Sequence, residues 1–233
     1  MKKRPITTLF MLMSLDGKIN SGASDELDVD KDWPFIDGVK EGIHQYYEIE
    51  ATTDLYSFNS GRVMEKIGVN DSVKDKEKIG VSFVILDRKP HLSESGVKYL
   101  ANWAKQLFVI TDNCEHPAFC LKKQYENINV LYYENGINLS QMLIDLNEQY
   151  GIERLTIQSG GTLNGAFLRA DLIDYVNVVI APVLVGGSHT NTLIDGKTLM
   201  KREELNLLKA MKLLECETLE DSYLRLKYKV IRD

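Results

Sequence analysis

With 233 residues, the chain can bury a substantial core, and 44% hydrophobic and 27% charged residues are ordinary for a globular protein. The net charge of −6 argues against non-specific nucleic-acid binding, which needs clustered positive charge. No apolar run approaches the roughly 18 residues of a membrane span. The three cysteines have no paired spacing, which suits a reducing compartment. We therefore expect a cytoplasmic protein that binds neither nucleic acid nor membrane.

The first half of the chain alternates apolar strands with helical segments. Continuous apolar and β-branched character predicts strands at 7–15, 55–58, 82–86 and 107–110. A polar, aspartate-rich loop over 21–32 follows the first strand, and apolar spacing predicts a helix over 38–50. Another helix begins at Gly61. Strands that alternate with helices indicate parallel pairing with crossover helices.

The second half continues this alternation and then changes character. Strands are predicted at 128–132, 154–157, 176–185, 213–219 and 222–230. Helices are predicted at 139–150 and 166–170. The turn at Glu220 and Asp221 is short enough for a hairpin between the last two strands. Together these elements predict a single α/β domain over 1–233, a three-layer α/β/α sandwich with a mainly parallel sheet and an antiparallel C-terminal hairpin.

In an open α/β sheet, ligands bind beyond the carboxyl ends of the strands. The turns that follow such ends here come after five residues: Leu15, Phe58, Leu86, Ile110 and Gln158. Candidate site residues are therefore sought at these turns.

The turn after Gln158 carries Ser159, Gly160 and Gly161, followed by Thr162 and Leu163. Glycines between a strand and a helix let backbone N–H groups approach an anion, and the helix dipole favours negative charge there. The turn thus suits a phosphate or pyrophosphate. A tight turn that needs glycine for its own geometry is the competing interpretation.

Two further turns supply cations. Arg62 follows Gly61 at a helix start, where a guanidinium matches phosphate in a bidentate fashion. Asp87, Arg88 and Lys89 follow another strand, and adjacent cations of this kind can recognise a nucleotide 2′-phosphate. An ordinary helix cap and solvated surface charges are the alternatives.

Asp16 and Lys18 close the first strand, in the segment Ser-Leu-Asp-Gly-Lys-Ile. A carboxylate and an ammonium this close together can bind a polar ligand, or move a proton if burial shifts a pKa. The alternative is a polar β-turn.

The sequence does not favour a metal site. Cys114, His116 and Cys120 lie together, but no second cysteine pair exists to complete a tetrahedral set. The remaining histidines are scattered, without the order of a hydrolase triad.

Five segments, in order and over nearly the whole chain, resemble the reductase domain of riboflavin biosynthesis, a member of the dihydrofolate-reductase-like family. They are Ser14–Ile19, Gly61–Val63, Val84–Arg88, Ser159–Gly165 and Ile180–Gly187. The deaminase half of the bifunctional enzymes, with its zinc-binding motifs, is absent from the sequence.

This resemblance implies a three-layer α/β/α fold, NADPH as cofactor and pairing as a homodimer. It implies cofactor contacts from Gly61, Arg62 and Val63, with Arg62 near the phosphates. Asp87 and Arg88 would lie by the adenosine end, and Ser159, Gly160, Gly161, Thr162 and Leu163 would cradle the pyrophosphate. Asp16 and Lys18 would face the substrate and the nicotinamide as catalytic residues.

The chain also departs from the family's pattern. Gln158 stands where these reductases usually have Glu, Ser159 where Gly is usual, and Arg62 where Thr is common. The resemblance implies NADPH-dependent reduction of an imine-like ribosylamino pyrimidine, 5-amino-6-(5-phosphoribosylamino)uracil. The alternatives are reduction of a pterin, of dihydrofolate or of another small C=N compound, and an NADPH-binding protein without catalysis.

Overall fold

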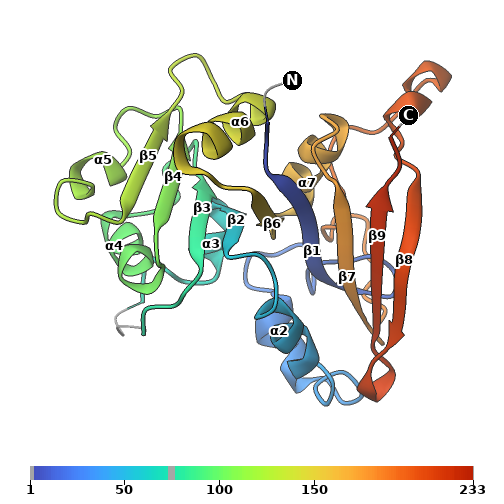
Figure 1. The fold of residues 1–233 in the computed structure, drawn as a ribbon. Helices are drawn as coiled ribbons and strands as arrows, with labels where there is room; N and C mark the ends of the chain where they lie inside the picture. Colours follow the sequence, from blue (N-terminus) through green and yellow to red (C-terminus); the bar gives the residue numbers. More distant parts are fainter. Residues whose placement is uncertain (1–2, 73–76, 233) are drawn as a thin grey trace. The chain divides into compact units, whose positions relative to one another are not determined.

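The computed structural model describes residues 3–72 and 77–232 of the chain. These residues form two compact units (Figure 1). Of the described residues, unit 1 comprises 3–5, 54–72 and 77–159, and unit 2 comprises 6–53 and 160–232. Unit 2 is therefore built from both ends of the chain, with most of unit 1 as a continuous segment between them. That one reductase domain spans residues 1–233 stays a prediction.

Unit 1 contains five parallel strands in the order β5-β4-β3-β2-β6. Their bounds are β2 Tyr56–Ser60, β3 Ser82–Leu86, β4 Leu107–Thr111, β5 Ile128–Tyr132 and β6 Arg154–Ile157. Because all five run the same way, the turns that follow β2, β3 and β4 lie at one edge of the sheet.

The helices of unit 1 cover both faces of its strands. They are α3 Gly61–Lys66, α4 Glu94–Trp103, α5 Ala118–Leu121 and α6 Leu139–Tyr150. On one face, Ile85 packs in a buried cluster with Leu100 of α4. On the opposite face, Phe108 of β4 contacts Tyr150 of α6, with ring centroids 4.9 Å apart. Unit 1 thus has the three α/β/α layers that the sequence predicts.

Unit 2 contains four strands in the order β1-β7-β9-β8. Their bounds are β1 Ile6–Ser14, β7 Tyr175–Ala181, β8 Met211–Thr218 and β9 Leu224–Val230. β1 and β7 are parallel, whereas β9 is antiparallel to both β7 and β8. The mainly parallel sheet and the antiparallel C-terminal hairpin are both confirmed.

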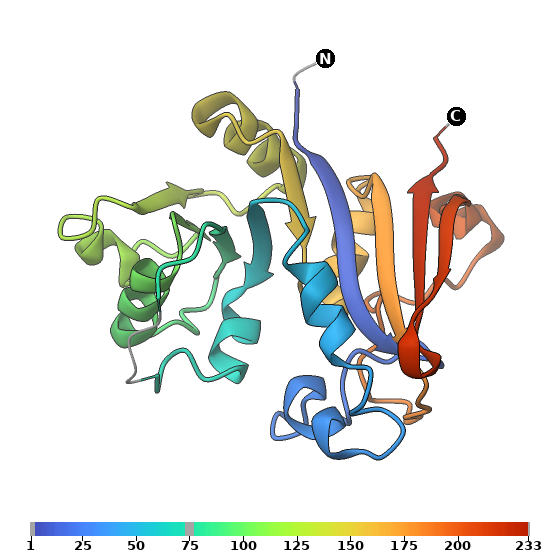
Figure 2. The same cartoon turned by 60° about the horizontal axis from the view of Figure 1, so that its bottom comes forward.

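The helical segments of unit 2 are short. They are α1 Val29–Asp32, η1 Trp33–Phe35, α2 His44–Glu50, α7 Gly161–Arg169, η2 Arg202–Leu207 and η3 Glu220–Ser222. Trp33 and Tyr46 pack with Phe10 of β1 in one buried cluster. Figure 2 has α2 in front of β1 and β7, and α7 behind them.

Most predicted elements lie within one or two residues of the observed bounds, and three depart further. The helix over 38–50 begins only at His44, since residues 37–43 form turns in which Gly38 has φ +83°. The strand over 176–185 ends at Ala181, immediately before Pro182, which has no N–H to donate to a ladder. The helix predicted at 166–170 starts five residues earlier, at Gly161.

Helix α4 was not predicted, although its N-cap Ser93 is visible in the sequence. The side chain of Ser93 accepts a hydrogen bond from the N–H of Gly96, and Val97, Leu100 and Ala101 bury one side of the helix. Across the described ranges, 3–72 and 77–232, the structure has no helix long and apolar enough to cross a bilayer.

Candidate functional site

A pocket of about 420 Å³ lies at the carboxyl ends of β2, β3 and β4 in unit 1. Eight residues from the turns after these strands line it: Ser60, Arg62, Leu86, Asp87, Arg88, Lys89, His91 and Asp112. Within unit 1, the turns after β2, β3 and β4 contribute residues to one pocket. The lining is rich in cations, which suits an anionic ligand.

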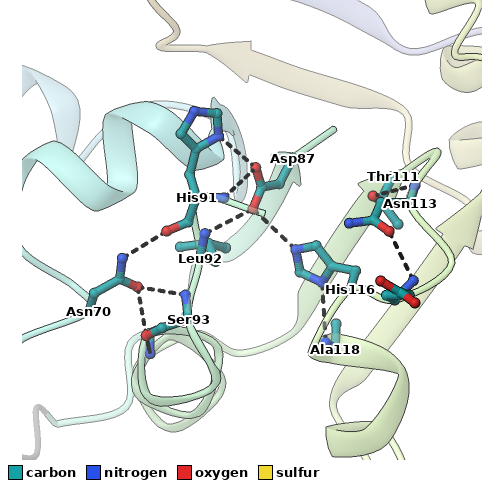
Figure 3. Close-up of polar contacts among 11 residues, drawn as sticks. Asn70, Asp87, His91, Leu92, Ser93, Thr111, Asn113, His116 and Ala118 are labelled. Carbon is teal, nitrogen blue, oxygen red and sulfur yellow. Dashed lines mark hydrogen bonds and ion pairs between the residues drawn. The ribbon is translucent and has the colours of Figure 1, made fainter. Parts of the chain in front are cut away.

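Asp87 anchors one side of this pocket (Figure 3). Its carboxylate is 1% exposed and accepts hydrogen bonds from protein groups on both oxygens. Oδ1 accepts from the backbone N–H and Nδ1 of His91, at 3.2 and 3.0 Å. Oδ2 accepts from the N–H of Leu92 at 3.0 Å and faces Nε2 of His116 at 3.1 Å. The carboxylate therefore fixes the loop after β3.

The hydrogen bonds of His116 define its tautomer. Its Nδ1 accepts from the N–H of Ala118 at 3.2 Å, so the proton lies on Nε2 and is donated to Asp87. Burial alone would raise the pKa of the Asp87 carboxyl. The hydrogen bonds from His116, Leu92 and His91 outweigh burial and hold this pKa below its ordinary value. Asp87 is thus a buried carboxylate anion at neutral pH.

Gly61 allows α3 to start directly against this carboxylate. A Cβ at Gly61 would lie 2.3 Å from Cγ of Asp87 and 2.4 Å from its Oδ1. A methyl group has no room there, so the glycine is required by packing within the protein. Gly61 and Asp87 were both predicted to contact the cofactor, and in the structure they pack against each other.

The cationic side chains of the pocket differ in their contacts and exposure. Arg88 donates from Nε to Asp112 at 2.8 Å, which fixes the guanidinium at the pocket wall. Arg62 and Lys89 are exposed. The N–H of Val63 donates to the side chain of Ser60, the N-cap of α3, at 3.3 Å. Val63 is not among the residues that line the pocket.

Asp16 in unit 2 ties two loops together. Its carboxylate accepts from the Ser14 hydroxyl at 2.6 Å, from the N–H of Val185 at 3.1 Å and from the N–H of Gly186 at 2.7 Å. The bonds from Ser14, Val185 and Gly186, in that order of size, lower the pKa of Asp16 from 3.8 to about 2. A carboxyl group with this pKa is ionised at neutral pH and does not serve as a proton donor.

Lys18 belongs to the same loop system. Its ammonium donates to the carbonyl of Gly187 at 2.7 Å and to that of Thr190 at 2.9 Å. Its backbone forms a bridge with Thr192. Asp16 and Lys18 therefore both hold segment 185–192 against the end of β1.

The glycine turn joins the two units along the chain. Ser159, at the end of unit 1, is buried, and Gly160 is the N-cap of α7 in unit 2. A Cβ at Gly161 would lie 2.2 Å from the carbonyl oxygen of Thr192, whereas no heavy atom of the described residues lies within 4 Å of a Cβ at Gly160. Close packing against Thr192 thus requires glycine at position 161, whereas the space beside Gly160 at the start of the helix is open. Thr162 is exposed and Leu163 half-buried in the first turn.

Gln158, where the family usually has Glu, lies in a polar network of unit 1. Its Oε1 accepts from the hydroxyl of Ser57 at 2.7 Å, and Ser57 in turn accepts from Asn59 at 3.2 Å. The backbone of Gln158 pairs with Phe58 of β2. Where a glutamate at position 158 would carry a negative charge, this chain has a neutral network of amide and hydroxyl groups.

Sequence reasoning missed three residues of the pocket system: His91, Asp112 and His116. His116 contacts Asp87 across 29 positions of sequence, and no local sequence pattern predicts this contact. The histidine was instead considered as a ligand beside Cys114 and Cys120, both of which are exposed. In the part of the chain that the structure describes, no group of three or more His, Cys, Asp or Glu side chains is placed to hold a metal ion.

Comparison with solved structures defines the class of the fold. The RibD structure of Acinetobacter baumannii, form 1, superposes with a TM-score of 0.69 at 22% identity, over 98% of this chain and 59% of that one. A pyrimidine reductase-like protein from Corynebacterium diphtheriae gives a TM-score of 0.64 at 15% identity, over 98% of this chain and 93% of that one. The chain thus shares the fold of these two structures.

The family follows from the sequence match. The model of the RibD C-terminal domain matches residues 5–224, and the chain belongs to this family. A 2,5-diamino-6-ribosylamino-4(3H)-pyrimidinone 5′-phosphate reductase of Methanothermobacter thermautotrophicus is 45% identical over 56 residues, 24% of this chain and 26% of that protein. The chain thus matches about a quarter of that relative and spans 59% of the Acinetobacter RibD chain.

Proposed function

We propose that this chain is an NADPH-dependent reductase of a ribosylamino pyrimidine 5′-phosphate. The observation that carries the proposal is the match of the RibD C-terminal domain over residues 5–224. A reductase of Archaeoglobus fulgidus with the same name as the Methanothermobacter relative is 22% identical over 208 residues, 85% of this chain and 90% of that protein. The substrate is then either this relative's diaminopyrimidinone or the corresponding uracil.

The residues present fit a phosphate-bearing nucleotide. Arg62, Arg88 and Lys89 bring positive charge to one pocket, and guanidinium groups bind phosphate in bidentate fashion. Gly160 leaves open space before the first turn of α7, where backbone N–H groups of Gly161 and Thr162 begin the helix. When bound, the reduced nicotinamide supplies the hydride.

Asp16 and Lys18 have the chemistry to orient a polar substrate. Asp16 stays ionised, so we assign it the role of gripping hydroxyl or amino groups rather than that of a proton donor. Lys18 has three donor protons, two of which lie on carbonyls of the loop, and its charge favours a substrate phosphate. Holding two reactants in register can account for about 7–11 kcal/mol of a barrier.

The test is oxidation of NADPH, followed by its absorbance, with three substrates in parallel: the diaminopyrimidinone, the uracil and dihydrofolate. Saturable turnover with either pyrimidine, and none with dihydrofolate, is the expected result. Turnover with dihydrofolate alone would replace the proposal by a pterin reductase. Binding of NADPH without turnover on any of the three would indicate a nucleotide-binding protein without this activity.

We also propose that the chain forms a homodimer through its C-terminal hairpin. All eight residues of the edge strand β8 are exposed. One face of the hairpin is apolar: Met211 pairs with Val230 and Leu213 with Tyr228. The other face is charged, with an ion pair between Glu217 and Arg225 at 3.5 Å. An exposed edge strand with one apolar face favours association with a second copy.

A further inference from the structure

We propose that His91 is the residue that selects a phosphate-bearing adenosine ribose, and that it does so by taking up a proton when the phosphate binds. The inference rests on the proposed nucleotide site and assigns its specificity to one side chain. The phosphate is a monoester, as on the 2′ position of NADP, and the competing ligand has a hydroxyl group in its place.

The position of His91 is determined by Asp87. Nδ1 of His91 lies 3.0 Å from Oδ1 of Asp87, and the backbone N–H of His91 donates to the same oxygen. The carbonyl of His91 also accepts from Asn70 at 2.7 Å, so the loop is held on both sides of the ring (Figure 3). Because a carboxylate accepts, Nδ1 of His91 is the donor, and Nε2 is the ring nitrogen left for a ligand. The side chain is 28% exposed and lines the pocket.

Among the residues that the structure describes, the other hydrogen-bond partners of Asp87 include no cation. His116 is neutral in the tautomer that its contact with Ala118 requires, and the remaining donors are backbone N–H groups of Leu92 and His91. Asp87 is buried, where an isolated carboxylate is costly. A proton on Nε2 would therefore give this buried anion a charged partner.

The described charged and titratable groups around His91, either lining the pocket or acting through Asp87, come from four segments of unit 1. They are Arg62 of α3, Asp87, Arg88 and Lys89 after β3, Asp112 after β4, and His116 through Asp87. Arg88 is paired with Asp112. A phosphate among these groups would place the His91 ring between two anions. A ring between two anions carries a proton on each nitrogen, one donated to Asp87 and one to the phosphate.

A ribose hydroxyl in place of the phosphate does not require a protonated His91. A neutral His91, with its proton on Nδ1, presents Nε2 as an acceptor, which suits a ribose hydroxyl without proton uptake. The pocket therefore prefers the phosphate more strongly as pH falls. The preference levels off where the phosphate itself gains a proton, at a pH of about 6.

The experiment measures binding of NADP⁺ and NAD⁺ between pH 6.5 and 8.5, by calorimetry in two buffers of different ionisation enthalpy. We expect the NADP⁺ affinity of the natural chain to fall as pH rises, with net proton uptake, and NAD⁺ affinity to change little. His91→Asn keeps a side-chain donor for Asp87 but has no Nε2. It should bind NADP⁺ about 10- to 100-fold more weakly at pH 6.5, the value of one charge-assisted hydrogen bond, and should lose the proton uptake.

His44→Asn, at an exposed histidine of unit 2, is the matched control and should behave like the natural chain. Equal proton uptake in His91→Asn and the natural chain would overturn the inference, as would NADP⁺ that binds no more tightly than NAD⁺. Because only binding is measured, absence of pyrimidine turnover alongside the expected pattern would overturn the proposed substrate and leave the role of His91 standing.

Discussion

Asp16 is held as an anion by three hydrogen bonds from its own unit, and this decides what its removal should do. We predict that Asp16→Asn lowers kcat/KM for the pyrimidine by about 10- to 100-fold, the value of one charge-assisted hydrogen bond, with NADPH affinity nearly unchanged. Steady-state kinetics with a fluorescence titration of NADPH measures both. Equal losses in turnover and NADPH affinity would mean that Asp16 is structural.

The same side chain predicts a pH dependence of stability. The folded-state pKa of Asp16 is lowered to about 2, so its stabilisation is present above pH 4 and is lost as pH falls through the folded value. The side chain is exposed, so solvent screening limits the effect to about 1 kcal/mol. Urea unfolding of the natural chain and Asp16→Asn should therefore differ at pH 5, and the difference should narrow towards pH 2. A constant difference would contradict the assignment.

Gly61 offers a sharper residue-scale prediction. In Gly61→Ala the new methyl group would overlap the buried carboxylate of Asp87, displacing it from four hydrogen bonds. We expect a loss of about 2–5 kcal/mol in the free energy of unfolding, from overpacking and from unsatisfied buried charge. Gly80→Ala, in the same unit with open space around the new Cβ, should change stability by less than about 0.5 kcal/mol.

Residues that follow a strand directly were predictable as site candidates. Asp16, Arg62 and Arg88 each come just after the end of a parallel strand, and strand ends are visible in the apolar pattern. The role of His116 was not predictable, because its contact with Asp87 crosses 29 positions. His91 lies only four residues after Asp87, but its bond to Asp87 depends on the fold of the loop. Nor does local sequence reveal how far the pKa of Asp16 is lowered, since beyond the bond from Ser14 this depends on N–H groups 169 and 170 residues away.

At the scale of elements, two adjacent glycines at the start of α7 have different expected roles. Gly160 is expected to contact a ligand, whereas Gly161 is required by packing within the protein. Gly160→Ala should leave stability within about 0.5 kcal/mol, because φ is −68° and the space is open. It should weaken NADPH binding by about tenfold, since a methyl group would stand where a pyrophosphate approaches the backbone.

Gly161→Ala is the partner variant, with the opposite expectation. Its Cβ would overlap the carbonyl of Thr192 and the side chain of Asp195, which costs about 1–3 kcal/mol by overpacking. Thermal unfolding and NADPH titration of both variants give the comparison. Strong NADPH binding by Gly160→Ala would remove this turn from the cofactor site.

Strand existence could be predicted more reliably than helix bounds. β3 has the predicted bounds of 82–86, because a strand buried on both faces is continuously apolar and ends where charge begins. The helix over 38–50 was predicted too long, because its apolar spacing continues through residues 38–43, which form turns that include Gly38 at φ +83°.

For the whole molecule, the proposed dimer gives a matched pair of variants on one strand. Leu213→Glu places a charge on the apolar face of β8, and Lys212→Glu changes the charged face. We expect the natural chain and Lys212→Glu to sediment as dimers at micromolar concentration, and Leu213→Glu as a monomer. A natural chain that sediments as a monomer would end the dimer proposal, and a dimeric Leu213→Glu would move the interface elsewhere.

The architecture of the whole molecule was predicted in class and in strand direction. Alternating apolar strands and helices indicated a mainly parallel α/β fold, and the short turn at Glu220 and Asp221 indicated the final hairpin. The division of the described residues into two compact units was not visible, because no Pro- or Ser-rich linker marks the boundaries at Thr53 and Gly160.

The order in which the chain enters the two units has a consequence for its synthesis on the ribosome. Most of unit 1 is one uninterrupted stretch, and its strands can assemble as they emerge. β1 is made first, but Thr8 meets Tyr175 of β7 only after more than 160 further residues. At about 5–20 residues per second, that wait lasts roughly 8–30 s. An apolar strand left without this partner for so long is a natural substrate for chaperones.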